Sequence, residues 1–400
     1  MTVHATRIAI TSEERRTRVD RLKAHAAAEG LSGIVLFDPY YILYYAGFAF
    51  MPTERPMAWL MNRSGRTAFF VPRLELEHAQ GLAQADDVLH YDEYPSQNHP
   101  LTFLSQHLAK LGVSGKIGAD DDGYPWVFGY RGPRLSEVTG ATVVPVRSFI
   151  EDQMAIKSPA EVALLRESVR WAHLAHTLLH RYTVVGASET DVSQRATTEA
   201  TRAMLDAIGP IYRGQSTMES GASASYRGQI GRGAAIPHAL AADIHFQAGD
   251  VLVTGASAPM WGYFSELERT MLLGPASEEQ RRFFGHMVTM QETAFEAIRP
   301  GRPTSEVDLA VRAYVEKHGL QPYAKHHTGH AIGLRFHEGP FFDSGDHTVI
   351  RPGMVFTVEP GLYVEGLGGF RHSDTVLVVD DGIELLTYYP RDLESLTLPI

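Results

Sequence analysis

Two glutamates in one predicted strand are the residues best placed to do chemistry. Glu266 and Glu268 lie in the run from Gly262 to Leu273, which is predicted to form a strand. Side chains two positions apart on a strand share a face, so both carboxylates should point to the same side of a sheet. The alternative is that Glu268 pairs with Arg269 or with another surface cation. If the shared face borders a site, it supplies two negative charges.

A histidine that follows a proline is the next candidate. His238 ends the segment Ala234-Ala-Ile-Pro-His238. Imidazole exchanges protons near neutral pH, so an enzyme could use it as a general acid or base. A lone histidine in such a place is more often structural than catalytic, and its role therefore depends on the motifs around it.

Further segments hold histidines and glutamates at spacings that form a known signature. With Gly262 to Thr270, these segments resemble the creatinase, aminopeptidase P and methionine aminopeptidase family. The resemblance covers essentially the whole chain and is strongest from residue 156 onward. The segments are Gly249-Asp250 to Gly255, His326-His-Thr-Gly-His330 with Gly333 and His337-Glu338, Val358-Glu359-Pro360-Gly361, and Gly369-Phe-Arg371-His-Ser373-Asp374.

The resemblance assigns residues of this chain to the family's metal-binding positions. Gly255 stands where the first metal-binding aspartate belongs, and Glu266 stands where the second belongs. His330 falls on the metal-ligand histidine, Glu359 on the glutamate of the VEPG strand, and Ser373 on a position that is glutamate in the family. Only His330 and Glu359 are unchanged among five ligands.

These substitutions predict a site without metal. A pair of divalent ions brings about four positive charges, which the family balances with four carboxylates and one neutral imidazole. A dinuclear site would lack two of those carboxylates here, and we therefore expect no cofactor. The alternative is one divalent ion held by Glu266, Glu268, His330 and Glu359.

Creatinase is the metal-free member of the family, and this chain resembles it more closely than it resembles the peptidases. Leu267-Glu268-Arg269-Thr270 reproduces the LERT segment of creatinase, and the resemblance makes His238 the proton-transfer group. Tyr44 to Pro56 resembles a creatinase stretch whose arginine, here Arg55, reaches the neighbouring subunit's site to hold a substrate carboxylate. The alternative for Arg55 is a surface ion pair with Glu54 or Asp38.

The resemblance implies a mechanism for C–N bond hydrolysis. The glutamates would face a cationic guanidinium or amidinium group, with Glu268 and Glu359 as catalytic residues and Glu266 in substrate binding. His238 would take a proton from the attacking water and return it to the departing nitrogen. His330 would orient the substrate or stabilise the tetrahedral intermediate.

Three more residues are expected to line the substrate site. His337 corresponds to the second active-site histidine of the family, and His326 also matches a family position. Phe341 stands where creatinases have a second carboxylate-binding arginine, so the substrate need not be creatine itself. We expect Phe341 to shape the wall of the pocket instead.

The predicted function is a creatinase-like, metal-independent C–N hydrolase. As an amidinohydrolase or cyclic-amidine hydrolase, it would act on a small carboxylated guanidino or amidine zwitterion such as creatine-like or ectoine-like molecules. One alternative is a metal-dependent Xaa-Pro dipeptidase or aminopeptidase. A second alternative is a non-catalytic binding protein of the same fold. The resemblance also implies a homodimer.

Composition is that of an ordinary enzyme. Four hundred residues, 44% of them hydrophobic, suffice for two domains with cores of their own. The net charge of −11 gives no reason to expect nucleic acid or an anionic membrane as partner. The absence of cysteine excludes disulfides, thiol nucleophiles and cysteine-ligated zinc. No signal peptide or membrane-spanning run is recognised, so a cytoplasmic location is expected.

The pattern of apolar residues predicts two domains. Residues 1–155 alternate short strands and helices, which predicts an α/β domain. Residues 156–400 should form the family's α+β pita-bread domain, a curved antiparallel sheet backed by helices. Ser158 and Pro159 should begin a long helix that ends near Tyr182. Further helices are expected at 12–29, 101–111, 189–208, 278–298 and 304–318.

Overall fold

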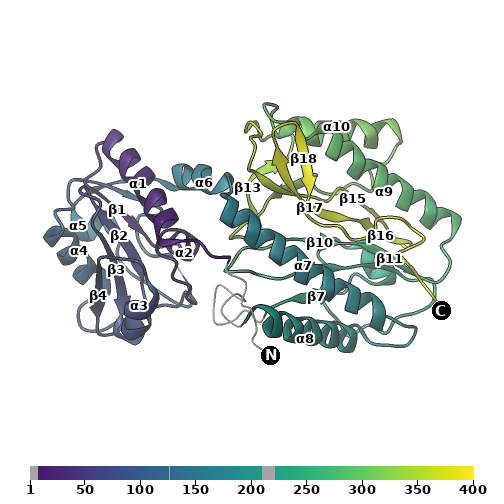
Figure 1. Cartoon of the computed structure of the whole chain (residues 1–400), viewed down its shortest axis with the longest axis horizontal. Helices are drawn as coiled ribbons and strands as arrows, with labels where there is room; N and C mark the ends of the chain where they lie inside the picture. Colours follow the sequence, from purple (N-terminus) through teal and green to yellow (C-terminus); the bar gives the residue numbers. More distant parts are fainter. Residues whose placement is uncertain (1–7, 126, 210–220) are drawn as a thin grey trace. The chain divides into compact units, whose positions relative to one another are not determined.

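The computed structural model describes residues 8–125, 127–209 and 221–400. The described chain divides into two compact units, one of residues 9–154 and one of residue 8 with residues 155–209 and 221–400 (Figure 1). The domain boundary expected between residues 155 and 156 stays a prediction.

The first unit is an α/β structure. Its strands are β1 (Gly33–Leu36), β2 (Ala58–Asn62), β3 (Thr67–Pro72), β4 (Asp87–Tyr91), β5 (Lys116–Ala119) and β6 (Thr142–Pro145). They form one mixed sheet in the order β4-β3-β2-β1-β5-β6, in which β2 is antiparallel to both of its neighbours. Its helices are α1 (Ser12–Ala28), α2 (Pro39–Ala46), α3 (Leu76–Leu82), α4 (Pro100–Lys110), α5 (Leu135–Thr139) and α6 (Arg147–Ala155).

The core of this unit follows from helical spacing. Leu101, Leu104 and Leu108 recur at intervals of three and four along α4, so they share one face of that helix. All three are buried in one cluster with Val35 of β1 and Phe70 of β3. The amphipathic face of α4 therefore covers the sheet.

The second unit combines long helices with antiparallel strands (Figure 1). Its helices are α7 (Pro159–Tyr182), α8 (Glu189–Ile208), α9 (Glu278–Ala297) and α10 (Ser305–Lys317). The largest sheet has the order β13-β12-β14-β17-β10-β9-β7, with β18 paired to β17. Its strands are β7 (Ser223–Ser225), β9 (Gly255–Ser257), β10 (Leu267–Glu268), β12 (Gly329–Ala331), β13 (Glu338–Phe342), β14 (Val355–Val358), β17 (Ser373–Val379) and β18 (Gly382–Leu385).

Two smaller sheets complete this unit. One has the order β19-β11-β8 and contains β8 (Val251–Val253), β11 (Thr270–Leu273) and β19 (Thr397–Leu398). The other pairs β15 (Gly361–Val364) with β16 (Gly368–Arg371). The strand expected over residues 262–273 is therefore wrong as a single element, because β10 pairs with β17 while β11 pairs with β8 in a different sheet.

The first turn of α7 confirms the capping prediction. The Ser158 hydroxyl accepts a hydrogen bond from Glu161 N at 3.2 Å, and the Glu161 carboxylate accepts one from Ser158 N at 2.7 Å. Pro159 needs no amide partner at the first helical position. This reciprocal cap fixes where the long helix begins.

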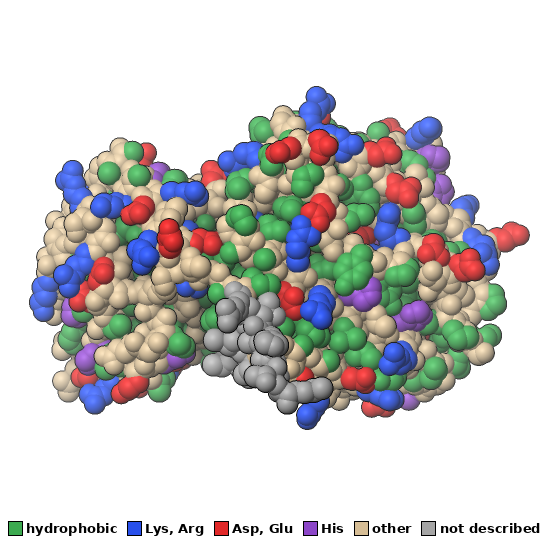
Figure 2. All heavy atoms as spheres, in the orientation of Figure 1, with side chains coloured by type: hydrophobic (Ala, Val, Ile, Leu, Met, Phe, Trp, Pro, Cys, Tyr) green, Lys and Arg blue, Asp and Glu red, His purple; other side chains and the backbone are tan. Residues whose placement is uncertain are grey.

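One face of the molecule is shown in Figure 2 with its side chains coloured by type. Acidic and basic side chains are interspersed over the face shown there. Within the described ranges, none of the helices is both long and apolar enough to cross a bilayer.

Adjacent strands of the large sheet bring the candidate residues together. In the order β12-β14-β17-β10-β9, each strand carries or borders one of the positions singled out in the sequence. Register pairs Glu268 with Ser373, Val358 with Asp374, and Leu267 with Ala256. These positions are far apart in sequence, but each lies on or next to one of five consecutive strands of the sheet. In strand order they are His330, Glu359, Ser373, Glu266 and Gly255.

Candidate active site

Three side chains from this sheet converge on one point. Glu266 lies just before β10, His330 lies in β12, and Glu359 follows β14. Each offers one ligand atom, a carboxylate oxygen or an imidazole nitrogen, and these atoms all lie within 4.8 Å of one another. His330 and Glu266 are buried, whereas the side chain of Glu359 keeps 14% of its surface exposed. The cluster is therefore reachable from the side of Glu359.

A glycine lets the strand that carries His330 come close enough. A Cβ atom on Gly329 would lie 2.1 Å from the carbonyl oxygen of Thr357 in β14, a distance that no side chain tolerates. The next residue, His330, donates its backbone N–H to the Thr357 hydroxyl at 3.2 Å. The close approach of β12 and β14 thus sets His330 beside Glu359.

The ring of His330 is oriented so that one nitrogen is left without a hydrogen bond. Its Nδ1 donates to the carbonyl oxygen of Ala331 at 2.9 Å, and a carbonyl oxygen can only accept, so Nδ1 carries the hydrogen. Nε2 lies 3.1 Å from Glu359 Oε1 but makes no aligned hydrogen bond with any described residue. In the neutral ring Nε2 bears a lone pair. This lone pair and the Glu359 carboxylate repel each other because both are electron-rich, so the pair is stable only when a proton or a metal ion binds to them.

The electrostatics of the cluster show where protons sit when no other cation is bound. Burial raises the pKa of Glu266 to about 8, and the charges of Glu359 and Glu268 act in the same direction. Burial alone would lower the pKa of His330, but its contact with Glu359 and the charge of Glu266 raise it to about 9. Burial opposes ionisation of Glu359, yet His330 and Arg371 outweigh it and hold its pKa at about 2. At neutral pH, protons therefore occupy His330 and Glu266.

Glu268 shares the strand face with Glu266, as expected, but lies outside the cluster. Its carboxylate is held by two guanidinium groups, those of Arg227 and Arg371, and Arg371 Nη2 donates to its Oε1 at 2.9 Å. Arg269, the partner weighed from the sequence, instead donates to Asp374 at 2.7 Å in the buried interior. Neither Arg227 nor Arg371 was assigned a role from the sequence. The one available signal was that a buried Glu268 needs opposite charge nearby.

The two lost carboxylates have been replaced by different contacts. At position 255 a Cβ atom would lie 3.6 Å from the Arg227 guanidinium carbon and 3.6 Å from Glu268 Oε1, so the guanidinium fills the space beside Gly255. At position 373 the Ser373 hydroxyl donates to Glu266 Oε1 at 2.5 Å. Ser373 therefore positions one ligand of the cluster instead of supplying another.

Two of the predicted histidines lie at the exposed side of the cluster. The ring of His337 stacks on His330, with ring centroids 3.8 Å apart and planes 18° from parallel. His238 is exposed, and its charge is one of the influences that lower the pKa of His337, after burial and His330. The structure thus brings His337 and His238 toward the same cluster, while their catalytic roles stay predictions.

His326 ends a directed chain of hydrogen bonds. Its Nδ1 donates to the carbonyl oxygen of His327 at 2.8 Å, so its Nε2 accepts from the Tyr363 hydroxyl, also at 2.8 Å. The Tyr363 oxygen accepts in turn from Arg371 Nη1 at 2.9 Å. Burial lowers the pKa of His326. The ring is therefore a neutral acceptor whose orientation is set by Arg371.

The two remaining predicted residues lie in different units. Phe341 is the cross-strand partner of His330, and its ring lies 5.6 Å from that of His327. Arg55 belongs to the first unit, where it is bidentate to Glu93 at 2.7 and 3.2 Å and also pairs with Glu54. The expected alternative, an ion pair with Glu54, is thus present, and binding of a substrate carboxylate by Arg55 stays a prediction.

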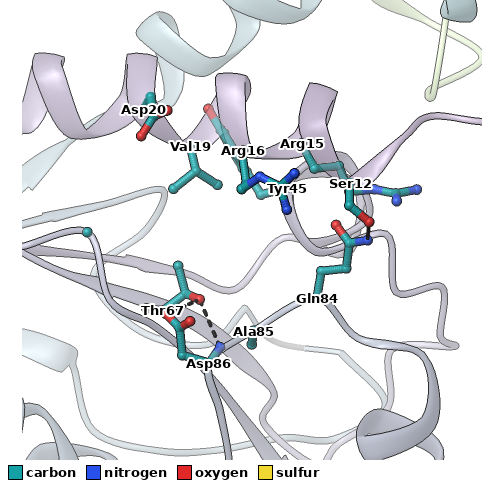
Figure 3. Close-up of a pocket in the computed structure, with 11 residues that line it drawn as sticks. Ser12, Arg15, Arg16, Val19, Asp20, Tyr45, Thr67, Gln84, Ala85 and Asp86 are labelled. Atoms are coloured by element: carbon teal, nitrogen blue, oxygen red, sulfur yellow. Dashed lines mark hydrogen bonds between the residues drawn. The ribbon is translucent and has the colours of Figure 1, made fainter.

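Two hollows lie outside the cluster. One, of about 620 Å³, is bordered by α10 and by His326, His327 and the Pro360-Gly361 pair that follows Glu359. The other, of about 460 Å³, belongs to the first unit and lies between α1 and the segment around Gln84 and Asp86 (Figure 3). None of the three ligands lines either hollow.

Comparison with known proteins identifies the family. Residues 163–380 match the model of metallopeptidase family M24, and residues 18–154 match the creatinase/prolidase N-terminal domain. A protein named probable dipeptidase PepE from Mycobacterium tuberculosis is 30% identical over 376 residues, 93% of this chain and 94% of that protein. The chain belongs to metallopeptidase family M24.

Solved structures agree with this placement. The Xaa-Pro dipeptidase from Bacillus anthracis has a TM-score of 0.81 and 25% identity, covering 96% of this chain and all of that one. Dipeptidase PepE from Mycobacterium ulcerans has a TM-score of 0.80 and 25% identity, covering 99% of this chain and all of that one. The α/β first domain and the pita-bread second domain are therefore confirmed, and this M24 protein is a hydrolase.

Membership in M24 corrects the predicted chemistry. The relatives are named dipeptidases and Xaa-Pro dipeptidases, so the prediction of a metal-independent amidinohydrolase or cyclic-amidine hydrolase is wrong. The prediction of no cofactor is also wrong, because M24 peptidases are dinuclear metal enzymes and Glu266, His330 and Glu359 form a ligand cluster. The error came from counting missing ligands without knowing where the remaining ones converge.

The cluster fits one divalent ion of the M24 type and does not fit a pair. Two carboxylates and an imidazole whose Nε2 faces one of them at 3.1 Å form a suitable set of hard oxygen and nitrogen donors. Glu266, His330 and Glu359 would hold that ion. Glu268, expected as a fourth ligand, is already engaged by Arg227 and Arg371. No carboxylate of residues 255 or 373 exists to hold a second ion.

Proposed function

We propose that this chain is a metal-dependent dipeptidase that cleaves the peptide bond of short peptides, including Xaa-Pro dipeptides. The observation that carries this proposal is the convergence of ligand atoms of Glu266, His330 and Glu359 within 4.8 Å of one another, with His330 Nε2 facing Glu359 Oε1 at 3.1 Å. The names of the relatives, dipeptidase PepE and Xaa-Pro dipeptidase, support the same substrate class.

In the proposed hydrolysis, the metal cluster, His337 and His238 each have a separate role. Glu266, His330 and Glu359 would hold a divalent ion, and that ion would supply Lewis acidity for polarising a scissile carbonyl and making a water molecule more acidic. His337, exposed and stacked on His330, is placed to donate a hydrogen bond to the substrate. His238 lies close enough to influence His337 and is the group proposed to exchange protons with the leaving nitrogen.

The direct test is peptide hydrolysis with and without metal. Protein stripped by a chelator should cleave none of Ala-Pro, Leu-Pro or Ala-Ala, and addition of Mn²⁺, Co²⁺ or Zn²⁺ should restore cleavage. Creatine and ectoine, offered in the same assay, should remain intact. Full peptide cleavage by stripped protein, or hydrolysis confined to the guanidino and amidine compounds, would refute the proposal.

Metal affinity should depend steeply on pH. Because Glu266 and His330 have pKa values of about 8 and 9, both carry a proton at pH 7, and an ion must displace these protons to bind. Each displaced proton weakens apparent affinity about tenfold for every pH unit below its pKa. Mn²⁺ should therefore bind at least about 100-fold more weakly at pH 6 than at pH 8.

Calorimetry in two buffers with different heats of ionisation measures this proton release. Between one and two protons should leave per ion bound at pH 7, and the Glu266→Gln variant should release fewer. Equal affinity at pH 6 and pH 8, with no heat attributable to buffer protonation, would show that the two groups are not protonated as described.

Two expectations go beyond what the fold and family establish. A homodimer in which Arg55 reaches the neighbouring site stays a prediction, as does the cytoplasmic location. For a dipeptide substrate, the carboxylate that Arg55 would bind is the peptide's own C-terminus.

A further inference from the structure

Arg227 is the most unusual group at the site. Its Nη2 donates to Glu268 Oε1 and lies 3.3 Å from Gln229 Oε1, and its side chain keeps 42% of its surface exposed. It lies 41 residues from Glu268 in sequence, so nothing local places it there. A guanidinium beside the carboxylates of a metal site is a permanent charge that an ion would have to displace or tolerate.

The space that Arg227 fills is the space of a missing ligand. A Cβ atom on Gly255 would lie 3.6 Å from Cζ and 3.6 Å from Nη2 of Arg227. An aspartate there would extend its carboxylate toward this guanidinium and toward Glu268. At position 255 the family has an aspartate that binds a metal ion. This chain has a glycine there, with the Arg227 guanidinium beside it.

Glu268 has little capacity left for a metal. Its Oε1 accepts from Arg227 and from Arg371, and its Oε2 accepts from Arg371 Nε. These are charge-assisted hydrogen bonds, and the Arg371 contact is bidentate. Both oxygens are thus committed to fixed organic cations.

Charge balance leads to the same conclusion. The three carboxylates of Glu266, Glu268 and Glu359 face the two guanidinium groups of Arg227 and Arg371, which leaves one net negative charge when all are ionised. One divalent ion changes this to one net positive charge. A second ion would raise it to three in a largely buried site, a cost that no described carboxylate offsets.

We propose that the Arg227 guanidinium stands in for the second ion of an M24 site, so that this chain works with a single divalent ion. The inference rests on the proposed metal-dependent peptidase function and specifies its metal content. Arg227 neutralises Glu268 permanently, while the exchangeable ion sits at Glu266, His330 and Glu359. The carboxylates at positions 255 and 373 are then not needed, because Arg227 takes the place of the ion that they would bind.

The first experiment measures how many ions the natural sequence binds. Metal-stripped protein titrated with Mn²⁺ should bind one equivalent by calorimetry and elemental analysis, and electron paramagnetic resonance should show an isolated Mn²⁺ signal. Two equivalents with a spin-coupled Mn²⁺ pair would overturn the inference while leaving a metal-dependent peptidase intact. Failure to bind any ion would overturn both proposals.

The second experiment rebuilds the missing half of the site. Arg227→Ala combined with Gly255→Asp and Ser373→Glu removes the fixed cation and restores two carboxylates, and stoichiometry should rise from one to two. Gly255→Asp with Ser373→Glu, leaving Arg227 in place, is the matched control and should stay at one. If the control also reaches two ions, or if the folded triple variant stays at one, Arg227 does not take the second ion's place.

Discussion

Glu359→Gln is expected to abolish peptide hydrolysis and to weaken divalent-ion binding by more than 100-fold. Glu359 has a pKa of about 2, so its carboxylate is already ionised at neutral pH. Glu266 and His330, in contrast, must each release a proton before they can bind an ion. Glutamine keeps the shape of the side chain but replaces a charged oxygen by a neutral one. Because loss of a group that only orients a ligand typically costs about 10- to 100-fold in metal affinity, loss of a ligand charge should cost more.

The matched control for this prediction is Glu365→Gln. Glu365 is exposed in the turn between β15 and β16, so the same chemical change there should leave ion binding and turnover as they were. Calorimetric titration with Mn²⁺ and a dipeptide assay give the two readouts. Wild-type affinity in the Glu359→Gln protein would mean that the ion binds elsewhere.

Arg269→Met is expected to destabilise the second domain by about 3–5 kcal/mol, the range found when one partner of a buried ion pair is removed. Arg269 is fully buried and pairs with Asp374 at 2.7 Å. Its remaining N–H groups bind four carbonyl oxygens, those of Glu268, Ser373, Tyr389 and Pro390. Methionine fills similar space, yet it leaves these acceptors and the Asp374 charge without their donor.

Thermal unfolding followed by circular dichroism measures this loss. For a domain of this size, 3–5 kcal/mol corresponds to a drop in Tm of roughly 10 °C. Arg170→Met is the control, since the Arg170 side chain is 62% exposed on α7 and its replacement should change stability by less than about 0.5 kcal/mol. An unchanged Tm for Arg269→Met would show that the surrounding carbonyl groups find other partners.

Local sequence signals predicted the longer helices α1, α4, α7, α8, α9 and α10, but they did not predict the shorter helices α2, α3, α5 and α6. Ser158, Pro159 and Glu161 place the start of α7 because a capping box and a first-turn proline act within four residues. The strands were harder, because strand pairing is decided by residues distant in sequence. The run from Gly262 to Leu273 divides between two sheets, and nothing within it indicates that β10 would find β17 while β11 finds β8.

The site shows the same division between local and distant information. Motif spacing singled out Glu266, His330 and Glu359, and the fold brings one ligand atom of each within 4.8 Å of the others, yet the metal-free conclusion drawn from the missing ligands was wrong. That conclusion assumed that a substrate cation balances the carboxylates. In the folded chain Arg227 and Arg371 provide much of that balance, and a sequence does not reveal which of its arginines will fold against a given glutamate.

The hydrogen-bond chain from Arg371 through Tyr363 to His326 has a consequence for selectivity. Arg371 donates to the Tyr363 oxygen, and the Tyr363 hydroxyl donates to His326 Nε2. A proton on Nε2 would therefore require this hydroxyl to turn away from the ring. Through the physiological pH range the His326 ring therefore stays uncharged, because burial lowers its pKa. If the ring borders the peptide of the proposed dipeptidase, preference among substrate side chains beside it should come from shape and apolar contact, and should change little between mildly acidic and mildly alkaline conditions.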